Sequence, residues 1–86
     1  MSIQETIFEI NEEALVCDGF DDAIIGMAER INLGPVVAYS VEKIIEILMK
    51  RDGMDYEEAY EFYSFNIVGA WMGEFTPVFI ENIIDI

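Results

Sequence analysis

Acidic residues dominate both ends of this chain. Residues 1–29 hold eight carboxylates and no Lys or Arg, and residues 52–86 hold another eight. The bases lie between these two blocks, at Arg30, Lys43, Lys50 and Arg51. The net charge is therefore -14 on 86 residues. A field of this sign repels nucleic acid and anionic membranes and attracts basic surfaces. We expect a basic protein partner and no direct binding of nucleic acid or membrane.

The chain is long enough for one domain, which we place at residues 1–86. A domain of this size buries roughly 60–65% of the surface that its unfolded chain exposes, so its stability is modest. Yet 53% of the residues are apolar and 13% are aromatic, unlike a disordered acidic tail. The apolar content is generous for the length and leaves material for a partner or for self-association.

The residue types that most catalytic sites need are scarce. The sequence has no His and one cysteine, Cys17, which we expect to pack as a small apolar residue. Nucleophilic triads and zinc sites are hard to build from this set. Neighbouring carboxylates such as Asp21 and Asp22 would not face each other on a helix. We therefore predict that the protein is not an enzyme and has no cofactor, no catalytic residue and no metal site.

The N-terminal half predicts a helix followed by a hairpin. Ser2 and Glu5 form a capping-box pattern at the start of an amphipathic helix that extends to about Glu13. Asn32 to Pro35 is a strong turn signal, which favours a hairpin of residues 23–30 with residues 36–39. A helix followed by a strand is the alternative, because an apolar stripe at helical spacing also runs through residues 24–31.

The C-terminal half predicts two helices and a short strand. Ser40 can cap a helix that ends at Gly53, and Asp55 can start another that weakens between residues 66 and 69. Val78–Ile80 follows Pro77 as an edge strand. We expect the apolar tail, residues 83–86, to dock on the body. The fold class is α+β: a β-hairpin or short antiparallel sheet packed against two or three helices.

Three stretches of the sequence are familiar together. They are GFDDAIIG at residues 19–26, RDGM followed by EEA within residues 51–59, and FNIVGAWMGE at residues 65–74 leading to Thr76-Pro77. With these stretches, the chain resembles a family of small acidic bacteriophage proteins over roughly residues 18–80. That family is uncharacterised and transfers no catalytic or binding residue. The resemblance implies a phage origin and an accessory role in the cytoplasm of an infected bacterium.

Two kinds of residue are candidates for partner binding. Acidic residues would form a docking surface, and Trp71, between two glycines, would anchor a recognition loop. The alternatives are an acidic surface that only keeps an apolar protein dissolved, and a Trp71 that is buried in the core. The candidate residues are Glu57, Glu58, Glu61, Asp21, Asp22, Trp71 and Glu74.

These features predict a non-enzymatic phage protein that binds a basic partner and inhibits a nucleic-acid-acting host defence enzyme. Mimicry of DNA is one route. Eighteen carboxylates on roughly 5,000 Å² average about one per 290 Å², against about one per 100 Å² on duplex DNA. Mimicry would therefore require the two acidic blocks to converge on one face. The alternative function is a phage structural or assembly protein that acts through homo-oligomerisation.

Overall fold

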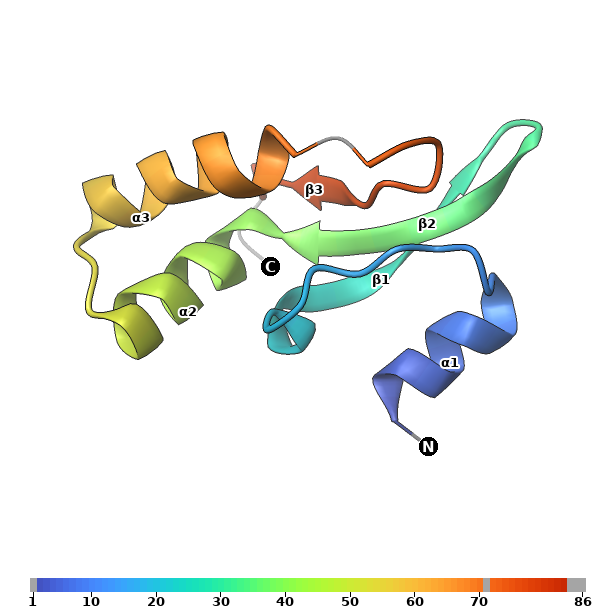
Figure 1. Ribbon diagram of the computed structural model, residues 1–86, viewed down its shortest axis with the longest axis horizontal. Coiled ribbons are helices and arrows are strands. Elements are labelled where there is room, and N and C mark those ends of the chain that lie inside the picture. Colours follow the sequence, from blue (N-terminus) through green and yellow to red (C-terminus); the bar gives the residue numbers. More distant parts are fainter. Residues whose placement is uncertain (1, 71, 84–86) are drawn as a thin grey trace.

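A computed structural model describes residues 2–70 and 72–83. It contains three helices and a small three-stranded mixed sheet, so the predicted α+β class is confirmed (Figure 1). Two further short helices, the 3₁₀-helix η1 and the π-helix η2, complete the described elements. The elements are α1 (Ile3–Ile10), η1 (Asp21–Ala23), β1 (Ile24–Arg30), β2 (Leu33–Ser40), α2 (Val41–Asp52), α3 (Tyr56–Phe62), η2 (Tyr63–Val68) and β3 (Val78–Ile80).

The predicted hairpin is confirmed, and its alternative, a helix over residues 24–31, is not formed. β1 pairs antiparallel with β2, with Met27 opposite Val37. The turn is tighter than the sequence predicts, because Asn32 takes the left-handed conformation (φ 61°) that asparagine tolerates better than most residues. Pro35 therefore lies inside β2. It has no ladder partner in either neighbouring strand, so its missing N–H leaves no hydrogen bond unmade.

The third strand corrects one feature of the predicted sheet. β3 lies at the edge, as expected, but it pairs parallel to β2, with Ala38 opposite Val78 and Ser40 opposite Ile80. The sheet order is β1-β2-β3, so β2 is central and the sheet is mixed rather than antiparallel. The parallel direction follows from the connection: α2, α3 and η2 carry the chain back before β3 begins.

Local side-chain chemistry explains the helix limits. Ser40 accepts the N–H of Lys43 at the start of α2, and Gly53 ends that helix in the left-handed conformation. Asp55 and Glu58 form the predicted capping box at the start of α3. α1 ends at Ile10, three residues before the predicted limit, because Asn11 bonds elsewhere. Its amide donates to the carbonyl of Pro35 at 2.8 Å, and its side-chain oxygen accepts the N–H of Glu13.

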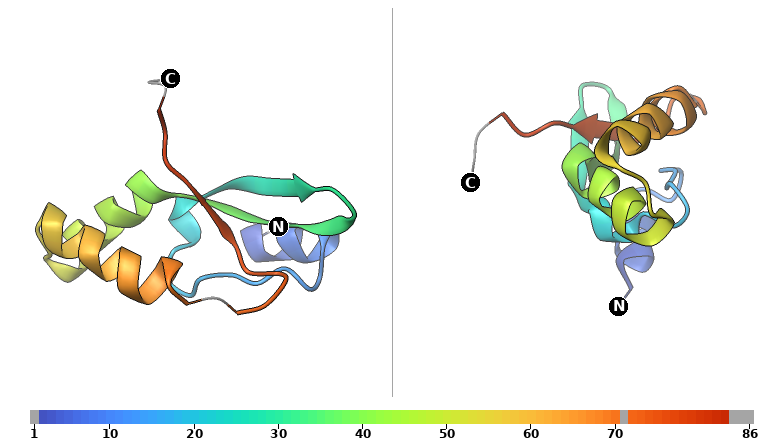
Figure 2. Two further views of the ribbon diagram at one scale, coloured as in Figure 1. Left: turned by 90° about the horizontal axis from the view of Figure 1, so that it is seen from above. Right: turned by 90° about the vertical axis from the view of Figure 1, so that its left-hand side faces the viewer.

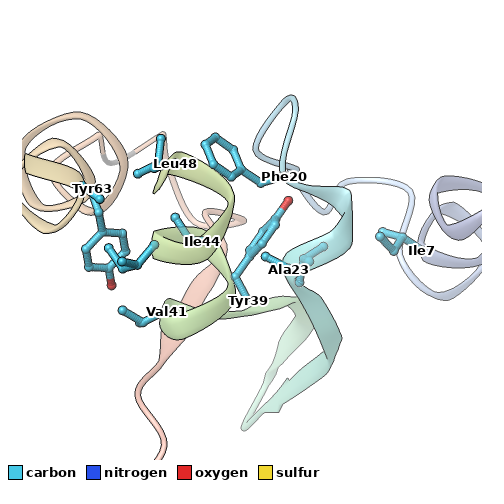
Figure 3. Packing of buried hydrophobic residues seen from close by; sticks show 11 residues of the cluster. Ile7, Phe20, Ala23, Tyr39, Val41, Ile44, Leu48 and Tyr63 are labelled. Atoms are coloured by element: carbon cyan, nitrogen blue, oxygen red, sulfur yellow. The ribbon is translucent and has the colours of Figure 1, made fainter. Parts of the chain in front are cut away.

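The core lies between the sheet and the α2–α3 pair. Tyr39 of β2 points between α2 and η1, beside Ala23 and Ile44 (Figure 3). Leu48 and Tyr63 continue the cluster toward α3, while Ile7 closes it from α1. Val41, Ile44, Ile45 and Leu48 are the buried stripe of α2, as their spacing predicts.

Two further features concern the exposure of the C-terminal tail and the positions of the acidic helices α1 and α3. Ile83 is 95% exposed, so the prediction that the tail docks on the body is wrong at this residue; residues 84–86 lie outside the described part. α1 and α3 lie at opposite ends of a molecule 38 Å long (Figures 1 and 2). The two acidic helices are therefore separated along the long axis of the molecule.

Candidate partner-binding surfaces

The predicted residues Glu57, Glu58 and Glu61 come together on the outer side of α3. All three are exposed, and Ala59 on the opposite side of the helix is fully buried. Glu58 has a structural role as well, because its carboxylate accepts the N–H of Asp55 at 3.2 Å. Glu57 and Glu61 have no such contact among the described residues, so their charges are available to a partner.

Phe65 lies next to these carboxylates and is 75% exposed. Glu58, Glu61, Phe62 and Phe65 line a shallow hollow of about 350 Å³ with Met54 and Asn66. We call Glu57, Glu58, Glu61, Phe62 and Phe65 the α3 crest. Aromatic residues at helical spacing are more often core residues than interface residues, so the sequence favours a core position for Phe62, Tyr63 and Phe65 over an interface. Tyr63 is buried, as this favours, whereas Phe62 and Phe65 are exposed. Phe65 follows Glu61 by four residues and Glu58 by seven, which puts it on the carboxylate side of the helix.

A second concave surface lies between α2 and α3, on the other flank of α3. Apolar side chains form its floor, two tyrosines of α3 form one wall, and carboxylates stand at its rim. This groove has a volume of about 600 Å³. Its lining residues are Val41, Ile45, Met49, Tyr56, Tyr60, Glu42, Glu46, Glu81 and Asn82. We call it the α2–α3 groove. The sequence did not reveal it, because its residues come from three separate segments.

Hydrogen bonds hold three of the polar side chains of this groove, those of Tyr60, Glu81 and Glu46. The Tyr60 hydroxyl donates to Glu81 at 2.8 Å, and this bond with the carboxylate raises the pKa of the Tyr60 phenol. Glu46 pairs with Lys50 at 2.6 Å, and the hydrogen bond and positive charge of Lys50 lower the pKa of Glu46. Glu42 has no hydrogen bond or ion pair among the described residues. Glu42 and Glu81 are thus the rim carboxylates that no described base neutralises.

Asp21 and Asp22 lie elsewhere, on η1. Asp22 lines a hollow together with Lys43, Lys50 and Arg51, which are three of the four bases. Asp21 accepts a hydrogen bond from Gln4 at 3.2 Å. The charge of Asp22 therefore lies beside bases of the same chain, and neither aspartate lines the hollow of the α3 crest.

The last two predicted residues belong to the segment between η2 and β3. The side chain of Glu74 is exposed, and its carbonyl accepts a hydrogen bond from Arg30 at 2.7 Å. Arg30 also lies over the ring of Phe75, at 5.7 Å from the centroid. Glu74 thus lies beside the hairpin and not on α3. Trp71 falls outside the described residues, so its burial stays a prediction.

The acidic surface as a whole is dilute. The accessible surface is 5894 Å², so eighteen carboxylates average about one per 330 Å². Ion pairs remove little of this charge, because the described residues form two, Lys50–Glu46 and Arg51–Asp52. Any DNA-like charge density would have to arise within a local cluster such as the α3 crest.

Clusters of metal-binding side chains and helices able to cross a membrane are both absent from the residues that the structure describes. These residues contain no group of three or more His, Cys, Asp or Glu side chains placed to hold a metal ion. None of their helices has the length and apolar character that a membrane crossing requires. Cys17 is partly buried, and this burial raises the pKa of its thiol, although a hydrogen bond with Tyr39 opposes the shift.

Comparison with known proteins adds no family to this description. The chain matches no protein-family model, no curated protein sequence and no solved structure.

Proposed function

We propose that this protein is a non-enzymatic binding protein whose α3 crest engages a basic surface on a protein partner. The observation that carries the proposal is the exposure of Phe65 beside Glu57, Glu58 and Glu61. A phenylalanine that is 75% exposed contributes almost nothing to the core. An exposed aromatic side chain among charges of one sign has the make-up of an interface anchor within a polar rim.

The two components of the crest have different roles in this proposal. The carboxylates act at long range and raise the association rate with a basic partner. Phe62 and Phe65 act at short range, where burial of their rings slows dissociation. α3, which carries most of the crest, lies at one end of the molecule, away from α1 (Figure 1).

The phage origin implied by the family resemblance suggests a class of partner protein. We propose a host nucleic-acid-acting defence enzyme, whose basic surface the crest would block. The overall charge density, about one carboxylate per 330 Å², argues for local occupation of that surface rather than imitation of a whole duplex.

Self-association is the second candidate function, and one observation favours it. A groove of about 430 Å³ between α1 and β1 has no charged residue in its lining. Ile3, Ile10 and Ile25 remain 41–51% exposed there. Analytical ultracentrifugation separates the two candidates when the protein concentration is varied from about 5 to about 500 µM, the range in which weak association is detected. A discrete oligomer that Ile10→Glu dissolves would favour assembly, whereas a monomer throughout would favour the crest.

Affinity capture with matched variants tests the proposed function. Phe65→Ala removes the exposed ring of the crest, and Phe8→Ala removes a ring that is 61% exposed on α1, at the other end of the molecule. We expect nuclease-treated bacterial lysate to yield a basic protein that Phe65→Ala loses and Phe8→Ala retains. Equal capture by both variants would contradict the proposal. Unchanged thermal stability of both variants would show that the loss is local.

A further inference from the structure

We infer that the α2–α3 groove is a second binding site, which takes a short peptide segment with Lys or Arg at one end and an apolar residue at the other. This inference shares with the proposed function the idea of a basic partner, but it concerns different residues. None of Glu57, Glu61 and Phe65 lines the groove.

The acidic end of the groove is set by the sheet. The parallel pairing of β2 with β3 ends at Ser40 and Ile80, so the chain segments that follow start side by side. Glu42 comes two residues after Ser40, and Glu81 comes directly after Ile80. Tyr60 reaches this end from α3, because its hydroxyl donates to Glu81. Two carboxylates and a tyrosine ring therefore gather where β2 passes into α2.

The other end of the groove is apolar. Val41, Ile45 and Met49 are four residues apart on α2 and form one stripe about 12 Å long. Tyr56 and Tyr60 run beside the stripe, with ring centroids 6.1 Å apart. α3 returns after the turn that follows α2, so Tyr56, its first residue, lies toward the Met49 end of α2 (Figure 1). Tyr56 is 60% exposed, so much of its ring is free for contact.

These two ends favour a ligand with matching polarity. A Lys or Arg head can pair with Glu42 and Glu81, and its stem and charge can lie against the Tyr60 ring. A Leu or Met about 12 Å away can cover Met49 and Tyr56. Glu46 extends the acidic rim but already pairs with Lys50. A second copy of the chain is a poor occupant, because each copy carries a net charge of -14.

A pair of peptides of equal composition tests this polarity. Acetyl-Arg-Arg-Ala-Ala-Leu-Leu-amide separates its charges from its apolar residues, and acetyl-Arg-Leu-Ala-Arg-Ala-Leu-amide mixes them. We expect the first peptide to shift the amide NMR signals of Glu42, Met49, Tyr56 and Glu81, and to bind several times more tightly than the second. Equal affinities, or shifts spread over all acidic segments, would overturn the inference, since net charge alone would then explain binding.

Matched charge variants locate the site. Glu42→Gln with Glu81→Gln should weaken the first peptide roughly fivefold, the size expected for two exposed ion pairs. Glu9→Gln with Glu12→Gln makes the same charge change near α1 and should leave the affinity unchanged. Glu57→Lys with Glu61→Lys should also leave the affinity for the first peptide nearly unchanged at about 150 mM salt. At that ionic strength the screening length is about 8 Å, so charges outside the groove have little effect. A response of the crest variant alone would overturn this inference and leave the proposed function intact.

The chain's own tail is the competing occupant, because Glu81 and Asn82 line the groove and the apolar residues 83–86 follow directly. The peptide titration is therefore repeated on a chain that ends at Asn82. Unchanged affinity supports an open groove in the full chain. If only the shortened chain binds the peptide, the groove belongs to the tail and the inference is overturned.

Discussion

The hydroxyl oxygen of Tyr39 accepts a hydrogen bond from the backbone N–H of Cys17 at 2.6 Å. Tyr39 is fully buried in the central strand, and its ring stacks on Phe79 of β3 at 5.7 Å between centroids. One side chain thus connects the segment before η1 with two strands of the sheet. Because a partly buried N–H still needs a partner, this bond fixes the path of a segment that lies outside the helices and strands.

Removal of that hydroxyl should destabilise the fold. Tyr39→Phe keeps the ring but leaves the partly buried Cys17 N–H without its acceptor, which costs about 0.5–1.5 kcal/mol. Urea unfolding followed by far-UV circular dichroism measures the change. Tyr56→Phe is the control, since Tyr56 is 60% exposed, and we expect it to change stability by less than about 0.5 kcal/mol. Equal effects of the two variants would show that the Tyr39–Cys17 bond adds no stability.

Alkaline pH should unfold the protein through two tyrosines. Burial raises the pKa of Tyr39 to about 12, and burial with the nearby Tyr60 and Glu81 raises the pKa of Tyr63 to about 12. The unfolded chain loses these protons near pH 10, so their contribution to stability is complete below about pH 10 and is lost as pH rises toward 12. Ultraviolet titration of phenolate absorbance, run with urea unfolding from pH 8 to pH 12, checks this. A free energy of unfolding that stays constant to pH 12 would contradict it.

Cys17 should react slowly with thiol reagents. Burial raises the pKa of its thiol, more than the hydrogen bond with Tyr39 lowers it, so little thiolate exists at pH 8. We expect a chromogenic disulfide reagent to modify the native protein at least roughly tenfold more slowly than the urea-unfolded chain. Comparable rates would mean that the segment around Cys17 opens readily.

The hairpin and the helix caps show what local sequence can predict. Asn32 identifies the turn, and Ser2, Ser40 and Asp55 each cap a helix. The capping box is complete at Asp55 and Glu58, whereas at Ser2 and Glu5 only the serine side chain bonds. The parallel pairing of β3 could not be predicted. The apolar character of residues 78–80 favours a strand but does not specify which strand it pairs with or in which direction. The end of α1 depends on Asn11 reaching Pro35, 24 residues away.

The candidate site was predictable only in part, for similar reasons. Capping-box logic places Glu57, Glu58 and Glu61 on one helix, and they lie together on its outer side. Asp22 was grouped with them by charge alone, although it lies beside Lys43 and Arg51 in the folded chain. Phe65 was assigned to the core with its aromatic neighbours, although its spacing from Glu58 and Glu61 puts it on their side of the helix. Glu81 joins the groove only through the sheet.

The protein should not bind nucleic acid directly. The net charge is -14, and three of the four bases share one hollow with Asp22 and Glu46. Phosphate binding needs a basic stripe that releases counterions, and this hollow is nearly neutral. In a gel-shift assay at physiological salt, we expect duplex and single-stranded DNA and RNA to remain unbound at micromolar concentrations of the protein. A retarded band under these conditions would contradict the account.

The association rate with the captured partner, measured as salt rises from about 0.1 M to 1 M, tests the central claim most directly. Glu57→Lys with Glu61→Lys reverses two crest charges and spares Glu58, whose carboxylate caps α3. Glu9→Lys with Glu12→Lys makes the same change at the far end. We predict that the crest variant associates at least roughly tenfold more slowly at 0.1 M salt, where the screening length is about 10 Å, and that the difference fades at 1 M. The far-end variant should stay close to the unmodified protein. Association rates that change neither with salt nor with charge reversal at Glu57 and Glu61 would contradict the claim that the acidic crest recruits a basic partner.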